Sequence, residues 1–376
     1  MLRSLVGSEM CIRDSSKRAN RGFGFDDITI VPQRRTRGLE EVNLRWKIDA
    51  VEFDFPIMGA PMDSVMCPDT VIAMGQMGGL GVLNLEGLWT RYADPLPLLE
   101  ELAGIDDPVE ATRRMQQVYS EPIKGELITE RMKQIREAGV PAAGSLSPQN
   151  TKEFAGTVEK AGVDFFVIRG TTVSAEHVSS HAEPLNLKQF IYDLDVPVIV
   201  GGCATYQMGL HLMRTGAAGV LVGFGGGATH ATRDVLGIAV PMASAVADLA
   251  EARRDYMDES GGRYVHVIAD GSLGTSGQIA KAIACGADAV MVGTPLARAT
   301  DAPGHGWHWG PEAWHADLPR GERVKFRQLG SFEEIMMGPS TVADGTMNLV
   351  GALKRTLANT GYTEVKEFQR VDVMVN

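Results

Sequence analysis

The chain has 376 residues, of which 44% are hydrophobic and 22% are charged, a balance typical of a folded globular protein. Its formal net charge of −11 opposes binding to nucleic acid or to an anionic membrane surface. The sequence contains neither a run of about 18 apolar residues, as a membrane span requires, nor a signal-peptide core. We therefore expect a cytoplasmic protein that binds neither nucleic acid nor membranes.

The four cysteines are too few and too scattered for a disulfide framework or a Cys-x-x-Cys metal site. They are Cys11, Cys67, Cys203 and Cys285. We expect Cys203 and Cys285 to be small buried hydrophobic residues.

Residues 1–15 read MLRSLVGSEMCIRDS and show neither an amphipathic period nor the pattern of a targeting segment. They look like translated sequencing-adapter sequence, so we treat them as a non-native leader. The domain is assigned to residues 21–376.

Short apolar runs recur from Phe53 onward, and each is followed by a helical pattern, as a parallel sheet buried on both faces requires. The predicted strands are residues 56–60, 81–84, 141–145, 164–168, 197–201, 219–223, 266–270 and 289–293. Helices are predicted over 205–215, 241–258 and 275–285, the last stopped by Gly286. Eight strands that alternate with helices favour an α/β fold, the closed (β/α)8 TIM barrel, over an open doubly wound sheet.

Two segments lie outside this repeat. Residues 85–139 predict a helical insert between strands 2 and 3, too short to be a separate regulatory domain. The tail after Pro303, which holds Trp307, Trp309 and Trp314, predicts a lid or a subunit-contact loop. The histidines of this tail (His305, His308 and His315) lack acidic or cysteine partners at ligand spacing, so a metal site is not expected there.

Glycine and hydroxyl residues gather where the last three strands end, which is where barrels commonly bind phosphate. The loop after strand 6 reads GFGGGATHATR (223–233), strand 7 ends in Asp270-Gly-Ser272, and strand 8 ends in Gly293-Thr294-Pro295. We expect backbone N–H groups and a helix opening after strand 8 to bind a phosphate. Asp270 would repel phosphate and is suited instead to accept hydrogen bonds from ribose hydroxyls.

Several motifs, in order over nearly all of the chain after Arg21, resemble the IMP dehydrogenase/GMP reductase family. They are PIMGAPMDSV (56–65), GGLGV (78–82), IADG (268–271) with SGQIAKA (276–282), and FRQLGS (326–331). The nearest likeness is to the compact, IMP dehydrogenase-related branch that lacks paired CBS domains, whose place is taken here by the helical insert.

The resemblance implies a barrel, usually a homotetramer, that binds a purine nucleoside monophosphate (IMP, XMP or GMP) and uses NAD or NADP. It implies substrate contacts from Ala60, Met62, Ala228, Asp270, Gly271, Ser272, Gly293, Thr294, Leu329 and Gly330. It also implies a potassium ion held by backbone carbonyls of Gly223, Gly225 and His230. The turn at 201–205 fits as well, with Gly202 where asparagine is usual.

The catalytic centre departs from the family pattern. The family uses a cysteine thiolate that adds to C2 of the purine, and His230 stands at that position here. An imidazole suits acid or base catalysis better than attack on a purine carbon. Thr232 keeps the neighbouring hydroxyl, so His230 and Thr232 are the candidate catalytic residues.

The cofactor side departs too, because Arg169 replaces an aspartate that the family directs at NAD. Arg169, Gly170 and Thr171 are the candidate cofactor residues, with Arg169 either gripping a cofactor phosphate or forming an ion pair behind the barrel rim. Phe326 replaces a phosphate-binding tyrosine.

The water-activating flap of IMP dehydrogenases is short here. The stretch from Phe332 to Gly345 lacks the flap's Arg-Tyr pair, and Arg320 and Arg323 are either substitutes for it or parts of a solvated loop. We expect an IMP dehydrogenase-type oxidoreductase. The alternatives are a GMP reductase and a purine-nucleotide-binding barrel with impaired catalysis.

Overall fold

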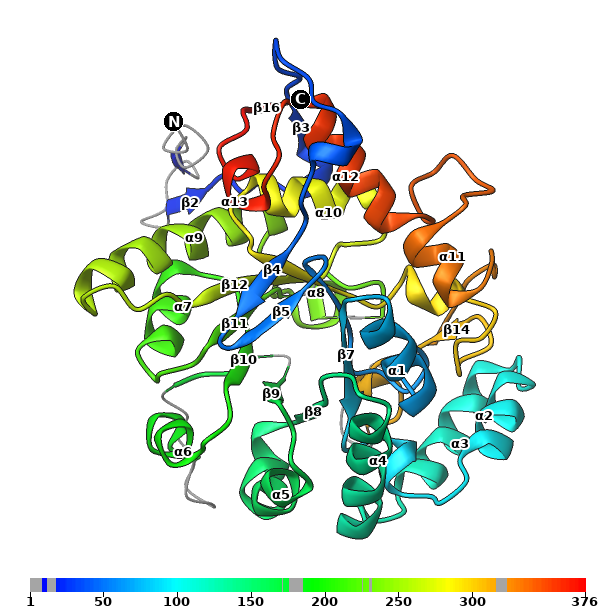
Figure 1. Ribbon diagram of the computed structural model, residues 1–376. Coiled ribbons are helices and arrows are strands. Elements are labelled where there is room, and N and C mark those ends of the chain that lie inside the picture. Colours follow the sequence, from blue (N-terminus) through cyan, green and yellow to red (C-terminus); the bar gives the residue numbers. More distant parts are fainter. Residues whose placement is uncertain are drawn as a thin grey trace.

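The computed structural model describes residues 9–11, 18–170, 172–175, 185–224, 226–229, 232–315 and 323–376, and it contains a closed barrel of eight parallel strands. Figure 1 shows these strands inside a ring of helices. They are β6 (Ile57–Gly59), β7 (Leu80–Asn84), β8 (Ala143–Leu146), β9 (Phe165–Arg169), β10 (Val198–Cys203), β11 (Gly219–Val222), β12 (His266–Asp270) and β13 (Ala289–Val292). The barrel closes where β13 pairs with β6, and the predicted (β/α)8 fold is confirmed.

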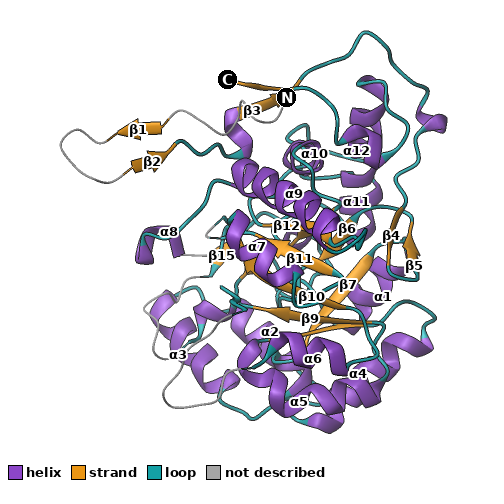
Figure 2. Ribbon diagram, turned by 90° about the vertical axis from the view of Figure 1, so that its left-hand side faces the viewer, coloured by secondary structure: helices purple, strands orange, loops and turns teal. Residues whose placement is uncertain are grey.

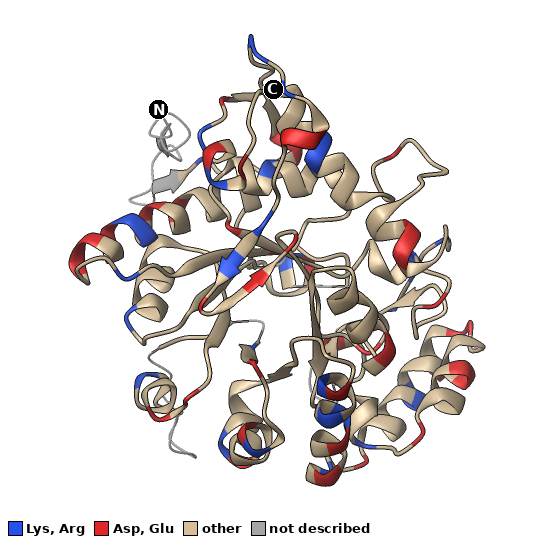
Figure 3. Ribbon diagram, viewed as in Figure 1, with Lys and Arg blue, Asp and Glu red and all other residues tan. Residues whose placement is uncertain are grey.

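The strands are continuous apolar runs because both of their faces are covered, the inner face by the barrel core and the outer face by helices. Charged residues accordingly lie mostly on the surrounding helices (Figure 3). The helices that follow the strands are α1 (Pro68–Gln76), α4 (Gly125–Glu137), α5 (Pro148–Ala161), α6 (Leu187–Asp193), α7 (Tyr206–Met213), α9 (Met242–Glu259), α10 (Ser276–Ala284) and α12 (Leu349–Asn359).

Local signals set several helix starts. The side chains of Ser147, Thr205 and Thr275 each accept a hydrogen bond from a backbone N–H in the first turn of α5, α7 and α10. Gly286 follows α10 with a φ of +114°, which only glycine adopts readily.

The predicted helical insert is confirmed between β7 and β8, but it is smaller than residues 85–139. It consists of the hairpin α2 (Leu96–Ala103) and α3 (Pro108–Tyr119). The third helix of the segment, α4, packs against α1 and α5 and is the regular barrel helix after β7. All three helices are amphipathic, so the sequence pattern did not separate the insert from the ring.

The amino ends of the strands are covered by a hairpin of β4 (Trp46–Ile48) and β5 (Val51–Phe53), which crosses the barrel in Figure 1. The Phe53 ring lies 6.0 Å from the Phe165 ring at the start of β9, and Trp46 Nε1 donates to Nδ1 of His266 at 3.2 Å. This end is therefore closed, which leaves the carboxyl ends of the strands for a site.

Two further two-stranded sheets lie outside the barrel. One joins segments far apart in the chain, and the other is a hairpin near the start of the chain. β3 (Ile28–Ile30) pairs with β16 (Val373–Val375), while β1 (Glu9–Cys11) pairs with β2 (Arg18–Asn20) in a hairpin that extends away from the barrel (Figure 2). The remaining elements are α8 (Thr232–Leu236), α11 (Phe332–Met337), α13 (Val365–Phe368), β14 (Trp307–His308), β15 (Val324–Lys325), and the short 3-10 turns η2 (Phe25–Asp27), η3 (Leu39–Glu41), η4 (Leu88–Thr90), η5 (Leu296–Arg298) and η6 (Pro311–Ala313). Within the described ranges, every helix is too short or too polar to cross a membrane.

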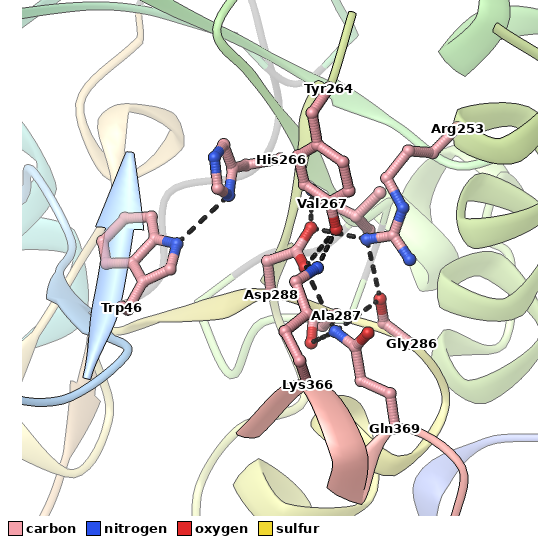
Figure 4. A network of polar contacts seen from close by, with 10 residues as sticks. All are labelled: Trp46, Arg253, Tyr264, His266, Val267, Gly286, Ala287, Asp288, Lys366 and Gln369. Atoms are coloured by element: carbon pink, nitrogen blue, oxygen red, sulfur yellow. Dashed lines mark hydrogen bonds and ion pairs between the residues drawn. The ribbon is translucent and has the colours of Figure 1, made fainter. Parts of the chain in front are cut away.

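A buried carboxylate ties the C-terminal segment to the closed end of the barrel (Figure 4). Asp288 directly precedes β13, and its side chain is fully buried. It accepts hydrogen bonds from Val267 N (2.9 Å), Arg253 Nη1 (2.5 Å), Tyr264 OH (2.7 Å), Gln369 Nε2 (3.1 Å) and Lys366 Nζ. These donors come from α9, β12 and α13 and the residues next to them, so one side chain joins three parts of the chain.

We predict that Asp288→Asn lowers the free energy of unfolding by about 3–5 kcal/mol, because it leaves the buried Arg253 cation without its counter-ion. Urea denaturation followed by circular dichroism measures this loss. Asp258→Asn, at an exposed position of α9, is the control and should change stability by less than about 0.5 kcal/mol. Equal losses in the two variants would contradict the role given to Asp288.

Candidate functional site

Two adjoining cavities open at the carboxyl ends of the barrel strands. The glycine-rich cavity, of about 280 Å³, lies over the ends of β11, β12, β13 and β6. The aromatic cavity, of about 480 Å³, lies over the ends of β7, β8 and β9 and is bounded by residues 309–315. Met62 and Arg169 line both cavities, so the two spaces meet at these side chains.

The glycine-rich cavity is built from the loops after β11 and β12, which are bonded to each other. The backbone N–H of Ser272 and its hydroxyl both donate to the carbonyl of Gly226, at 2.9 and 2.8 Å. Gly271 has a φ of +125° and Ser272 a φ of +55°. The turn needs glycine at position 271 because L-residues rarely adopt that φ.

The structure brings together eight of the ten predicted substrate residues in this cavity. The eight are Ala60, Met62, Ala228, Asp270, Gly271, Ser272, Gly293 and Thr294. Leu329 and Gly330 do not line either cavity: Leu329 N donates to Arg298 O at 2.9 Å, and Gly330 forms a β-bridge with Ala299. Phe326 lies beside them, with its ring 4.6 Å from the guanidinium of Arg298.

The prediction that a helix begins directly after strand 8 is wrong. Residues 293–295 lead into η5, a single 3-10 turn of three residues, after which Ala299 is extended. So short a turn has few aligned peptide dipoles and little partial positive charge at its start. Any anion bound here depends on loop N–H groups rather than on a helix terminus.

Arg169 and Asp270 form an ion pair across the mouth of the barrel. Arg169 Nε, at the end of β9, donates to Asp270 Oδ2, at the end of β12, at 2.9 Å. The two side chains are only 13% and 16% exposed. Burial alone would lower the pKa of Arg169, but the carboxylates of Asp270 and Glu312 outweigh it and raise that pKa. Arg169 thus makes an ion pair, as one prediction had it, although the pair lies at the cavity boundary and not behind the rim.

The aromatic cavity has an acidic lining. Asp63, Glu86 and Glu312 contribute carboxylates, and among the described lining residues Arg169 is the only lysine or arginine. Of the predicted cofactor residues, Arg169 and Gly170 line this cavity, while Thr171 lies outside the described residues.

Asp63 is the most buried of these carboxylates. It is 2% exposed, and burial raises its pKa, an effect that the hydrogen bond from Tyr119 and the nearby Arg91 charge only partly offset. Asn84 Nδ2 donates to its Oδ1 at 3.3 Å.

The sequence did not single out two features of the cavity walls. Tyr119, from the insert, stacks on Trp314 with ring centroids 4.6 Å apart. His308 lines the glycine-rich cavity, with Nδ1 3.0 Å from the Ser64 hydroxyl. The tryptophans of the tail were the available signal, because large aromatic residues between glycines predict a wall over a site as well as a subunit contact.

The candidate catalytic residues are not assembled in the described part of the site. His230 and Gly225 lie outside the described residues, so the predicted catalytic imidazole and potassium site stay predictions. Thr232 is fully buried at the start of α8 and lines neither cavity. Gly223, the third predicted potassium ligand, lies so close to the Asp270 carbonyl that a Cβ there would come within 1.7 Å of it.

The described cysteines do not supply a thiolate. Cys203 is fully buried, its Sγ donates to Leu221 O at 3.4 Å, and burial raises its pKa to about 12. Burial likewise raises the pKa of Cys285 to about 12 and that of Cys67 above its usual value. The prediction that Cys203 and Cys285 are small buried residues is confirmed.

Arg323 is neither in a solvated loop nor in a cavity. It is 9% exposed, and its guanidinium donates to Leu102 O and Ile105 O, both at 2.5 Å. Leu102 is in the last turn of helix α2, whose terminal carbonyls need donors, and Ile105 lies two residues beyond the helix. Arg320 lies outside the described residues, and within the described ranges no His, Cys, Asp and Glu side chains gather as a metal site.

Comparisons with known proteins agree with this geometry. The sequence model of the IMP dehydrogenase / GMP reductase domain matches residues 22–312. An uncharacterized oxidoreductase of Mycolicibacterium smegmatis is 49% identical over 364 residues, covering 95% of this chain and 97% of the relative. An inosine-5'-monophosphate dehydrogenase of Thermoplasma acidophilum is 42% identical over 147 residues, covering 39% of this chain and 28% of the relative. The crystal structure of an IMP dehydrogenase/GMP reductase-like protein from Corynebacterium glutamicum superposes with a TM-score of 0.91 at 48% identity, covering 97% of both chains.

Proposed function

The chain belongs to the IMP dehydrogenase/GMP reductase family of oxidoreductases, and from that premise we propose that it oxidises IMP to XMP with NAD and water. The observation that carries the proposal is the pair of cavities that meet at Met62 and Arg169. Hydride transfer needs the reacting carbons of two ligands held in contact, and adjoining cavities of about 280 and 480 Å³ could hold one ligand each.

The glycine-rich cavity would hold the purine nucleoside monophosphate. Loop N–H groups of Gly271 and of residues 293–294 would donate to the phosphate, and Asp270 would accept from a ribose hydroxyl. Met62 and Ala60 would contact the base, next to the second cavity. The ion pair with Arg169 supports this role, because it offsets the repulsion between Asp270 and a phosphate.

The aromatic cavity would hold the nicotinamide dinucleotide, which accepts the hydride when bound. Its charge favours NAD over NADP, because the 2′-phosphate of NADP would lie among the carboxylates of Asp63, Glu86 and Glu312. The only arginine of the described lining already pairs with Asp270.

Two alternatives each have an observation in their favour. A GMP reductase needs no water-activating flap, and the short segment that begins with α11 favours that direction. A purine-nucleotide-binding barrel without turnover is favoured by the buried state of the described cysteines. In the leading proposal, His230 acts as acid or base, potassium is held by backbone carbonyls, and the protein is a homotetramer.

Absorbance at 340 nm separates these functions. We expect it to rise when the full chain is mixed with IMP, NAD and potassium. A fall with GMP and NADPH would instead assign a GMP reductase. No change in either mixture, with IMP binding still seen by calorimetry, would contradict the enzyme and leave a nucleotide-binding protein.

We further predict that Gly271→Ala weakens IMP binding at least about tenfold, because the φ of +125° strains alanine and moves the loop N–H groups. Gly262→Ala is the matched control: its φ is +108°, and a Cβ there would touch nothing. Both variants should lose about 1–3 kcal/mol of stability. Calorimetry should find weaker IMP binding in Gly271→Ala alone, and equal affinities would contradict the assignment of this cavity.

A further inference from the structure

Tyr119 connects the insert α2–α3 to the wall of the aromatic cavity. Tyr119, the last residue of α3, is 4% exposed. Its hydroxyl donates to Asp63 Oδ2 at 2.6 Å and accepts from Trp309 Nε1 at 2.9 Å. One side chain of the insert therefore joins the loop after β6 to the segment that bounds the cavity.

The barrel side of this connection is rigid. Besides Tyr119, Asp63 accepts from Leu88 N at 3.0 Å and from Asn84 Nδ2 at 3.3 Å, and Asn84 is the last residue of β7. The next residue towards the N-terminus is Met62, which lines both cavities. The Asp63 carboxylate that accepts from Tyr119 is therefore held in place, and it lies beside the position where the two ligands would meet.

The other side of the connection is the segment of residues 307–315, which contacts both the insert and the loop after β6, where the Ser64 hydroxyl accepts from Trp309 N at 3.3 Å. Trp307 Nε1 donates to Ala103 O at 3.0 Å, and Arg323 donates to two carbonyls at the end of α2. Trp314 stacks on the Tyr119 ring, with an angle of 6° between the planes. Tyr119, which itself lines the aromatic cavity, contacts residues 309–315 directly at Trp309 and Trp314.

We propose that Tyr119 is a positioning residue through which the α2–α3 insert holds residues 309–315 over the aromatic cavity and so sets the affinity for the dinucleotide. The inference rests on the proposed function, because it takes the dinucleotide to be the ligand of that cavity. Nucleotide binding in the glycine-rich cavity should not depend on Tyr119, which does not line it. The apparent Kd rises as the inverse of the fraction of molecules whose wall is in place.

The test is Tyr119→Phe, which keeps the ring stacked on Trp314 and removes only the hydroxyl. Tyr92→Phe is the matched control, because the Tyr92 hydroxyl donates to Val118 O at 2.9 Å in the same region and Tyr92 lines neither cavity. Calorimetry on the full chain should show the Kd for NAD raised about 10-fold in Tyr119→Phe, with the Kd for IMP changed less than about 2-fold. In turnover, KM for NAD should rise while kcat is nearly unchanged.

Equal weakening of NAD and IMP binding, or the same loss of NAD affinity in Tyr92→Phe, would overturn the proposal. So would unchanged affinity for NAD in Tyr119→Phe. The unfolding midpoint should fall further in Tyr119→Phe than in Tyr92→Phe, because Tyr119 loses two hydrogen bonds, one of them to a carboxylate, and Tyr92 loses one.

A readout without ligand separates this proposal from the proposed function. Hydrogen exchange of the backbone at residues 307–315 should be faster in Tyr119→Phe than in the wild type and in Tyr92→Phe. If the wild type binds neither NAD nor IMP, the proposed function fails, yet faster exchange confined to this segment still supports the positioning role. Unchanged exchange there overturns the positioning role itself.

Discussion

The ion pair between Arg169 and Asp270 is the interaction on which the site depends. It spans the barrel mouth between β9 and β12, which are not neighbours in the sheet, and it marks the boundary between the two cavities. Neither charge is well hydrated, so each depends on the other for its stabilisation. With Asp270 neutralised in this way, the loops after β11, β12 and β13 can present N–H groups to an anion.

The two halves of the mouth are built differently. The glycine-rich half uses turns at the ends of consecutive strands, in which glycine allows positive φ and close approach. Part of the wall of the aromatic half comes from outside the barrel, from the α2–α3 insert and residues 307–315. Departures from the family's motifs occur on both sides, with His230 in the loop of the glycine-rich half and Arg169 where the two halves meet.

The sequence predicted the barrel well because each strand is a short, fully buried apolar run, and these runs are regularly spaced. It also predicted the glycine-rich residues, since strand ends meet at one face of a barrel. It did not predict contacts between distant segments, such as Tyr119 with Asp63 or Arg323 with the end of α2, because spacing along the chain says nothing about them. The helix expected after strand 8 failed for a local reason: Pro295 can open a helix, but nothing in the pattern showed that the turn would stop at Arg298.

None of the described cysteines supplies a thiolate, so whether the chain can catalyse the reaction depends on residue 230. Cys203 is fixed on β10 with its Sγ bonded to a strand carbonyl, so a small movement of a loop would not bring it to a ligand. Two adjoining cavities are nevertheless present. The proposed binding can therefore be measured separately from turnover.

We propose that the two cavities hold different ligands at the same time. The test is a calorimetric titration of NAD into the full chain saturated with IMP. We expect one NAD to bind per chain, with an affinity no weaker than that measured in the absence of IMP. If saturating IMP abolishes NAD binding, the two ligands share one cavity, and the assignment of separate sites on either side of Arg169 is contradicted.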